Sequence, residues 1–191
     1  MKILIMIAVA AVSLSACNGE DKQSQETSAT TTDTSLLEVQ ANTDGNSANP
    51  VKAVVSSYLK LKNALANDDG KAAASAGSEV QKAIAKADTA YFSADQKKIF
   101  AEVNEDAIEH AEHIAANATN IEHQREHFET LSKDLYDMVK VFGTGQTLYQ
   151  THCPMYNNNK GANWLSETKE VKNPYFGSKM STCGEVKEQI N

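Results

Sequence analysis

Residues 120–143, NIEHQREHFETLSKDLYDMVKVFG, decide the fold class of this chain. Their larger apolar residues recur every three or four positions, which is the spacing of one face of an α-helix. Asn120 is a suitable N-cap and Gly143 a suitable C-terminal stop. The stretch therefore predicts an amphipathic helix, with a core face formed by Ile121, Phe128, Leu131, Leu135, Val139 and Phe142.

Three earlier segments predict further helices. Asn49 and Pro50 mark a helix start, and residues 67–70 end that helix. An alanine-rich helix follows over residues 71–88, and Ser93 with Gln96 forms a capping box for a third helix that continues to about residue 118. Four helices joined by short turns predict an all-α fold, an antiparallel four-helix bundle. Its other expected core residues are Val51, Val54, Val55, Tyr58, Leu61, Leu65, Ala76, Val80, Ala83, Ile84, Ala87, Phe100, Val103, Ala107 and Ile114.

Composition agrees with a helical domain and excludes some classes of protein. The 191 residues include only 9 glycines and 3 prolines, which favours helix over sheet. The net charge of -7 argues against a nucleic-acid-binding protein, which normally has a basic face. Three cysteines are too few for a disulfide-dense scaffold.

The first 16 residues predict a secretory signal peptide. Lys2 precedes an apolar run that is too short to span a bilayer, which needs roughly 20 residues. The run ends in Leu14-Ser15-Ala16-Cys17, which is similar to the lipobox of bacterial lipoproteins, where the cysteine is lipidated. We therefore expect a lipid anchor at Cys17 in the Gram-negative envelope. Residue 18 is Asn18 and not the aspartate that often retains lipoproteins at the inner membrane, so we expect the outer membrane rather than the inner membrane.

Residues 17–48 are expected to form a disordered tether. They are almost all small or polar, so they bury too little apolar surface to offset the entropy lost on ordering. The expected organisation is a signal peptide over 1–16, a tether over 17–48, and a helical domain over 49–191. From about residue 148 this domain becomes aromatic and rich in turns, which predicts an irregular C-terminal cap.

The cap contains two pairs of sulfur residues, Cys153 with Met155 and Met180 with Cys183. Thiolate and thioether are soft donors that select Cu(I) over hard cations, so these four residues predict a Cu(I) site. A Cys153–Cys183 disulfide is the alternative, because disulfides form outside the cytoplasm. It would close a loop of roughly 30 residues and contribute about 3 to 4 kcal/mol. In that case the methionines would be ordinary core residues. Spacing alone leaves both interpretations open.

Histidines on the last two helices are further candidate ligands. His113 and His127 lie on the flanks of their apolar faces, where they could meet a ligand held by the cap. His110 lies near the centre of its apolar face, and His123 is expected to face away. No nucleophile elbow or phosphate loop is present, so we expect no enzyme.

Four stretches together resemble a known family. They are YLKLKNAL (58–65), IEHQREHFETLSKDLYDMVK (121–140), CPMYNNNKGANWLS (153–166) and NPYFGSKMSTCGEVKE (173–188). They are similar to a bacterial envelope family that carries a domain of unknown function, DUF3347, and the resemblance covers about residues 51–190. That family includes lipoproteins and occurs fused to periplasmic adaptor subunits of heavy-metal efflux pumps. The resemblance implies metal handling, as copper sequestration or delivery to an efflux system. The competing hypothesis is an envelope interaction module without a metal.

Overall fold

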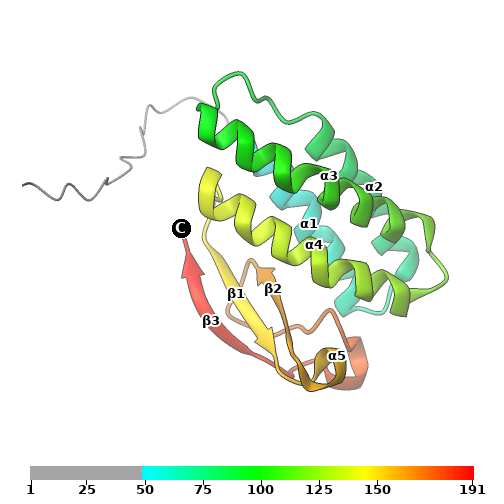
Figure 1. Ribbon diagram of the computed structural model, residues 1–191. Coiled ribbons are helices and arrows are strands. Elements are labelled where there is room, and N and C mark those ends of the chain that lie inside the picture. Colours follow the sequence, from blue (N-terminus) through cyan, green and yellow to red (C-terminus); the bar gives the residue numbers. More distant parts are fainter. Residues whose placement is uncertain (1–48) are drawn as a thin grey trace, which may run out of the picture. The chain divides into compact units, whose positions relative to one another are not determined.

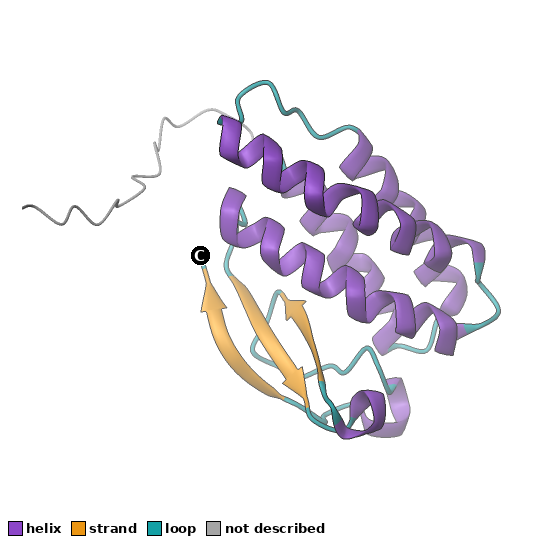
Figure 2. Ribbon diagram, in the orientation of Figure 1, coloured by secondary structure: helices purple, strands orange, loops and turns teal. Residues whose placement is uncertain are grey.

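A computed structural model describes residues 49–191 of the chain. The predicted signal peptide, the tether and Cys17 lie outside these residues. The described part is mostly helical, with one small antiparallel sheet near the C-terminus (Figures 1 and 2). The long helices are α1 (Lys52–Ala66), α2 (Gly70–Ala85), α3 (Ala94–Ala116) and α4 (Ile121–Phe142). The C-terminal elements are β1 (Leu148–Cys153), α5 (Tyr156–Asn159), β2 (Ala162–Ser166), η1 (Gly177–Met180) and β3 (Glu185–Ile190).

Side-chain caps set the starts of three helices. The Asp69 carboxylate accepts a hydrogen bond from the backbone N–H of Ala72 at the start of α2. Ser93 and Gln96 form the predicted reciprocal capping box of α3. Asn120 caps α4 as predicted, and α4 ends at Gly143, whose φ of 74° suits glycine. The predicted caps of α3 and α4 are therefore confirmed, whereas α1 begins at Lys52 and not at Pro50 as predicted.

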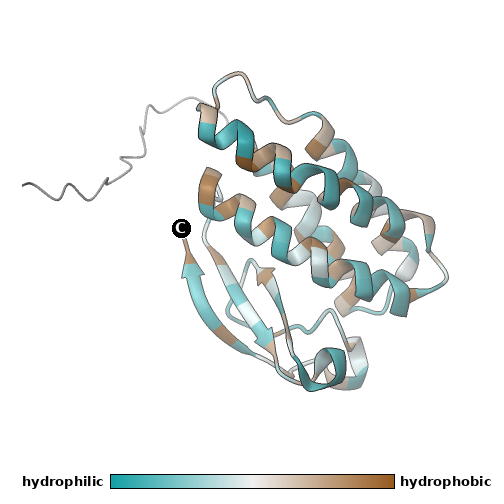
Figure 3. Ribbon diagram, viewed as in Figure 1, coloured by the Kyte–Doolittle hydropathy of each residue, from teal (hydrophilic) through white to brown (hydrophobic). Residues whose placement is uncertain are grey.

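The four long helices pack in sequence order, α1 on α2, α2 on α3, and α3 on α4. The ribbons of α3 and α4 that face the viewer in Figure 3 are coloured mostly as hydrophilic. The buried side chains of the helices are mostly apolar. Most of the predicted core residues are buried, and the others, such as Ala83, Ala87 and Val103, are partly buried against the core. The helix faces were thus predicted correctly.

The expectation of a purely α-helical fold with an irregular cap is wrong in one respect. The C-terminal segment forms a three-stranded antiparallel sheet of order β2-β1-β3. In β1, Thr151 pairs with Trp164 of β2 and with Val186 of β3, and a bulge precedes it on the β3 side. In β1 the buried residues are Leu148, Thr151 and Cys153, and in β3 only Ile190 is buried, so neither strand has the strict alternation of apolar and polar residues that predicts a sheet.

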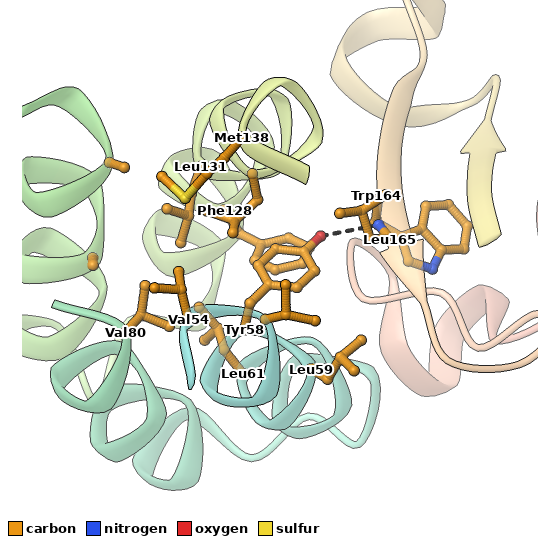
Figure 4. Close-up of a cluster of buried hydrophobic side chains, with 14 of the residues drawn as sticks. Val54, Tyr58, Leu59, Leu61, Val80, Phe128, Leu131, Met138, Trp164 and Leu165 are labelled. Carbon is orange, nitrogen blue, oxygen red and sulfur yellow. Dashed lines mark hydrogen bonds between the residues drawn. The ribbon is translucent and has the colours of Figure 1, made fainter. Parts of the chain in front are cut away.

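The hydrophobic core is continuous between the helices and the sheet, and it includes Tyr58 of α1 and Trp164 of β2. Tyr58 stacks on Phe128 of α4, with ring centroids 5.2 Å apart, and both side chains are fully buried (Figure 4). Its hydroxyl oxygen accepts a hydrogen bond of 3.1 Å from the backbone N–H of Leu165 in β2 and bonds the Ser132 hydroxyl at 2.8 Å. The sheet and the helices therefore share one hydrophobic core.

Two buried cations also join the helices to the C-terminal segment. The Arg125 guanidinium donates to the carbonyl oxygen of Pro174 at 2.8 Å and bonds the Asp68 carboxylate at 2.6 Å. Hydrogen bonds from Ser178 and Arg125 lower the pKa of Asp68 to about 2. Lys62 bonds Glu167 at 2.8 Å, and burial lowers the pKa of Lys62. No pattern in the sequence marks either cation as buried.

Candidate functional site

The two cysteines of the cap lie in contact. Cys153 ends β1 and is completely buried, while Cys183 precedes β3 and is partly buried. Their sulfur atoms are 3.1 Å apart, and both are free thiols. A disulfide bond is about 2.05 Å long, so the pair is close but unbonded here. The disulfide alternative stays a prediction.

The environment of the pair favours the protonated thiol. The hydrogen bond with Cys153, followed by burial, raises the pKa of Cys183 to about 11. A catalytic cysteine normally has a lowered pKa, because the thiolate is the nucleophile. A metal ion would instead displace the thiol proton on binding. The distance between the two sulfur atoms allows either a shared metal ion or a disulfide bond.

Both predicted methionines adjoin Cys183 through the main chain. The backbone of Met155 hydrogen-bonds to the Cys183 sulfur, and the carbonyl oxygen of Met180 accepts from the Cys183 N–H at 3.0 Å. Their side chains are not core residues, because Met155 is 49% and Met180 37% exposed. The structure thus brings the four predicted sulfur residues into one region of the cap.

An acidic groove runs beside Met155. Its volume is about 730 Å³, and it is lined by Glu122, Glu126, Glu129, Met155, Tyr156, Asn157, Asn158, Asn159 and Phe176. Asn157, Asn158 and Asn159 all have positive φ values, between 52° and 64°. The Asn157 amide donates to the Glu129 carboxylate. The three glutamates of α4 therefore make this face of the groove acidic.

The histidines are arranged differently from the sequence prediction. His113 and His127 lie together with His110 and His123 between α3 and α4. Among residues 49–191, the cluster with metal-ligand spacing consists of His113, His123 and His127 and includes no cysteine. His123, which was expected to face away from the apolar face of its helix, lies beside His113 and His127. The signal for this cluster is a pair of histidines on each of two consecutive helices.

His152 does not join the cysteines. Successive side chains of a strand point to opposite faces, so His152 and Cys153 lie on different faces of the sheet. The Nδ1 atom of His152 instead hydrogen-bonds to the Asn163 side chain at 2.8 Å.

Comparison with protein families identifies the helical part of the chain. Residues 54–147 match the model described as "Protein of unknown function (DUF3347)". Residues 54–147 belong to this family. The match covers α1 to α4 and ends before β1, so it is shorter than the expected 51–190 and leaves the cysteines and methionines of the cap outside.

Neither the curated proteins nor the solved structures contain a match to this chain. Within residues 49–191, none of the helices has the length and apolar character needed to cross a membrane. The DUF3347 family itself is of unknown function, so function has to be argued from the side chains of this member.

Proposed function

We propose that this DUF3347 protein is a lipid-anchored envelope protein that binds Cu(I) through Cys153, Met155, Met180 and Cys183. In this proposal the helices form an antiparallel four-helix bundle that supports the cap, and Cys17 carries the anchor. The bound copper is sequestered or passed to a heavy-metal efflux system. The protein acts as a binding protein and not as an enzyme.

One observation supports this proposal above the others. Two thiols 3.1 Å apart are accompanied by two methionines that are exposed, although methionine is usually a core residue. A purely structural cap would be expected to bury Met155 and Met180. Soft sulfur donors at the surface are instead suited to receive and release Cu(I).

The test compares Cu(I) affinity in three methionine variants. Met155→Leu and Met180→Leu each remove one thioether with little change in volume, so folding should change by less than about 1.5 kcal/mol. Met138→Leu is the matched control, because Met138 is a buried methionine of α4. Competition with a chromophoric Cu(I) chelator under reducing conditions should show weaker binding for the first two variants only.

Two results would refute the proposal. The first is that the wild-type protein does not compete for Cu(I). The second is that all three variants bind as tightly as wild type.

The competing hypothesis is an interaction module with a Cys153–Cys183 disulfide. The contact between the two sulfur atoms also supports it. The number of free thiols in protein purified from its own envelope distinguishes this hypothesis from Cu(I) binding. A count of zero at residues 153 and 183, without bound copper, would favour the disulfide.

A further inference from the structure

Four of the five histidines in the chain form a cluster between α3 and α4, the two helices that lie side by side in Figure 1. The rings of His113 and His127 stack with centroids 4.3 Å apart, and His123 meets His127 edge-on at 4.5 Å. One ring nitrogen from each of these three lies within 4.8 Å of the other two. His110 completes the cluster, with its Nδ1 atom 2.9 Å from Nδ1 of His127.

The sequence spacing explains why these rings meet. His110 and His113 are three residues apart on α3, and His123 and His127 are four apart on α4. Residues with these spacings share one helix face. The short turn between α3 and α4 folds the two helices against each other, so the two histidines of α3 meet the two histidines of α4.

In His123 and His127, a hydrogen bond at Nδ1 determines that the Nε2 lone pair is the one that can bind a metal ion. Nδ1 of His123 lies 3.1 Å from a carboxylate oxygen of Glu126, which requires the proton to be on Nδ1 and leaves Nε2 free. A proton on Nδ1 of His127, donated to His110, likewise leaves Nε2 of His127 free. Metal-binding histidines usually have such a partner on the other ring nitrogen.

We propose that His113, His123 and His127 bind one divalent transition-metal ion, and that His110 positions His127. Neutral imidazoles bind Cu²⁺, Zn²⁺ and Ni²⁺, whereas Ca²⁺ and Mg²⁺ require oxygen ligands. This site differs from the proposed Cu(I) site in its elements, its donor atoms and the oxidation state of its metal. It therefore does not depend on the proposed function.

Small side-chain movements are enough to bind the ion. Zn–N bonds of about 2.0–2.1 Å place tetrahedral nitrogen ligands about 3.3 Å apart, whereas these ring nitrogens lie within 4.8 Å of one another, so they must approach by at most about 1.5 Å. His113 is 46% and His123 34% exposed, so both rings can turn without disturbing the core. The same exposure admits the ion. It also leaves the fourth position for water or for the carboxylate of Glu109, which lies 3.9 Å from His113.

The test is a titration of the full-length protein in detergent with Zn²⁺ alone, followed calorimetrically. We expect about one equivalent of bound Zn²⁺ in the wild-type protein. His113→Ala and His123→Ala should each lower the affinity at least about 100-fold, and His110→Leu about 10- to 100-fold. In the His110→Leu variant, long-range proton–nitrogen NMR spectra should also show that His127 no longer holds one tautomer. Loss of packing alone would not produce this change.

Two control variants test whether Zn²⁺ binds at this cluster or at another part of the protein. His152→Ala removes the histidine outside the cluster, and Cys183→Ser removes one predicted Cu(I) ligand. Neither should change Zn²⁺ affinity, and circular dichroism should show that every variant remains helical. The proposal is overturned if wild type takes up no stoichiometric Zn²⁺ or if His113→Ala behaves like His152→Ala. It is also overturned if Cys183→Ser alone abolishes binding.

Discussion

Replacing Tyr58 with phenylalanine removes one oxygen atom from the point where α1, α4 and β2 meet. That oxygen accepts the N–H of Leu165 and bonds the Ser132 hydroxyl, and Tyr58 is fully buried. The ring itself still fits against Phe128. The substitution therefore tests the hydrogen bonds without opening a large cavity.

The expected loss of stability is about 2 to 4 kcal/mol. Loss of the hydrogen bond to Ser132 costs about 1 kcal/mol net. The buried N–H of Leu165 is also left without its acceptor, which costs about 1 to 3 kcal/mol. In Ser132→Ala the tyrosine oxygen still accepts from Leu165, so the expected cost is only about 1 kcal/mol.

Urea denaturation of wild type and both variants measures these differences. Tyr91→Phe is the matched control, because Tyr91 is the most exposed large hydrophobic residue described and should change stability by less than about 0.5 kcal/mol. The double variant Tyr58→Phe/Ser132→Ala should lose less than the sum of the two single losses, because both disrupt one bond. A loss below about 1 kcal/mol in Tyr58→Phe would show that this hydroxyl does not hold the sheet to the helices.

Leu135, Asp134 and the proposed lipidation site Cys17 give three more predictions. Leu135 is fully buried on α4, so Leu135→Ala should cost about 2 to 5 kcal/mol by thermal denaturation, and a shift of a degree or two would contradict this helix face. Burial, then repulsion from Asp106 and Asp137, raises the pKa of Asp134 to about 6. The folded state therefore keeps a proton that the unfolded state releases near pH 4, so stability falls as the pH rises through 4 to 6. At pH 7 Asp134→Asn should be more stable by about 1 kcal/mol, a value reduced for partial solvent exposure, and it should lose this pH dependence. Cys17→Ala should release the protein from membranes, and retention after a high-salt wash would exclude a lipid anchor at that residue.

Local signals predicted the helices, whereas features that depend on contacts between elements were missed. The capping box of Ser93 and Gln96 depends on four consecutive residues, so it can be read directly from the chain. The burial of Arg125 depends on Asp68 and Pro174, which approach it only after folding. No periodicity on a single helix contains that information.

In the candidate sites, too, some features could be predicted from residue spacing, whereas others depend on contacts between helices. The spacing of Cys153, Met155, Met180 and Cys183 identified one region of the cap, and the structure places these residues near each other. His123 was misplaced because a single-helix projection distinguishes only the core face from the opposite face. In a helix hairpin there is also an edge that faces the neighbouring helix, and His123 lies there.

The buried polar links described above determine how this protein can be dissected. Tyr58, Lys62 and Arg125 all lie within the family match over 54–147, yet each has a hydrogen-bond partner beyond residue 147. A fragment that ends at the family boundary would leave two buried cations without those partners and would expose the apolar surface beneath β2. The family boundary is therefore not a folding boundary. Any relative that consists of the helices alone would need another segment, or a second protein, to shield that side of the bundle.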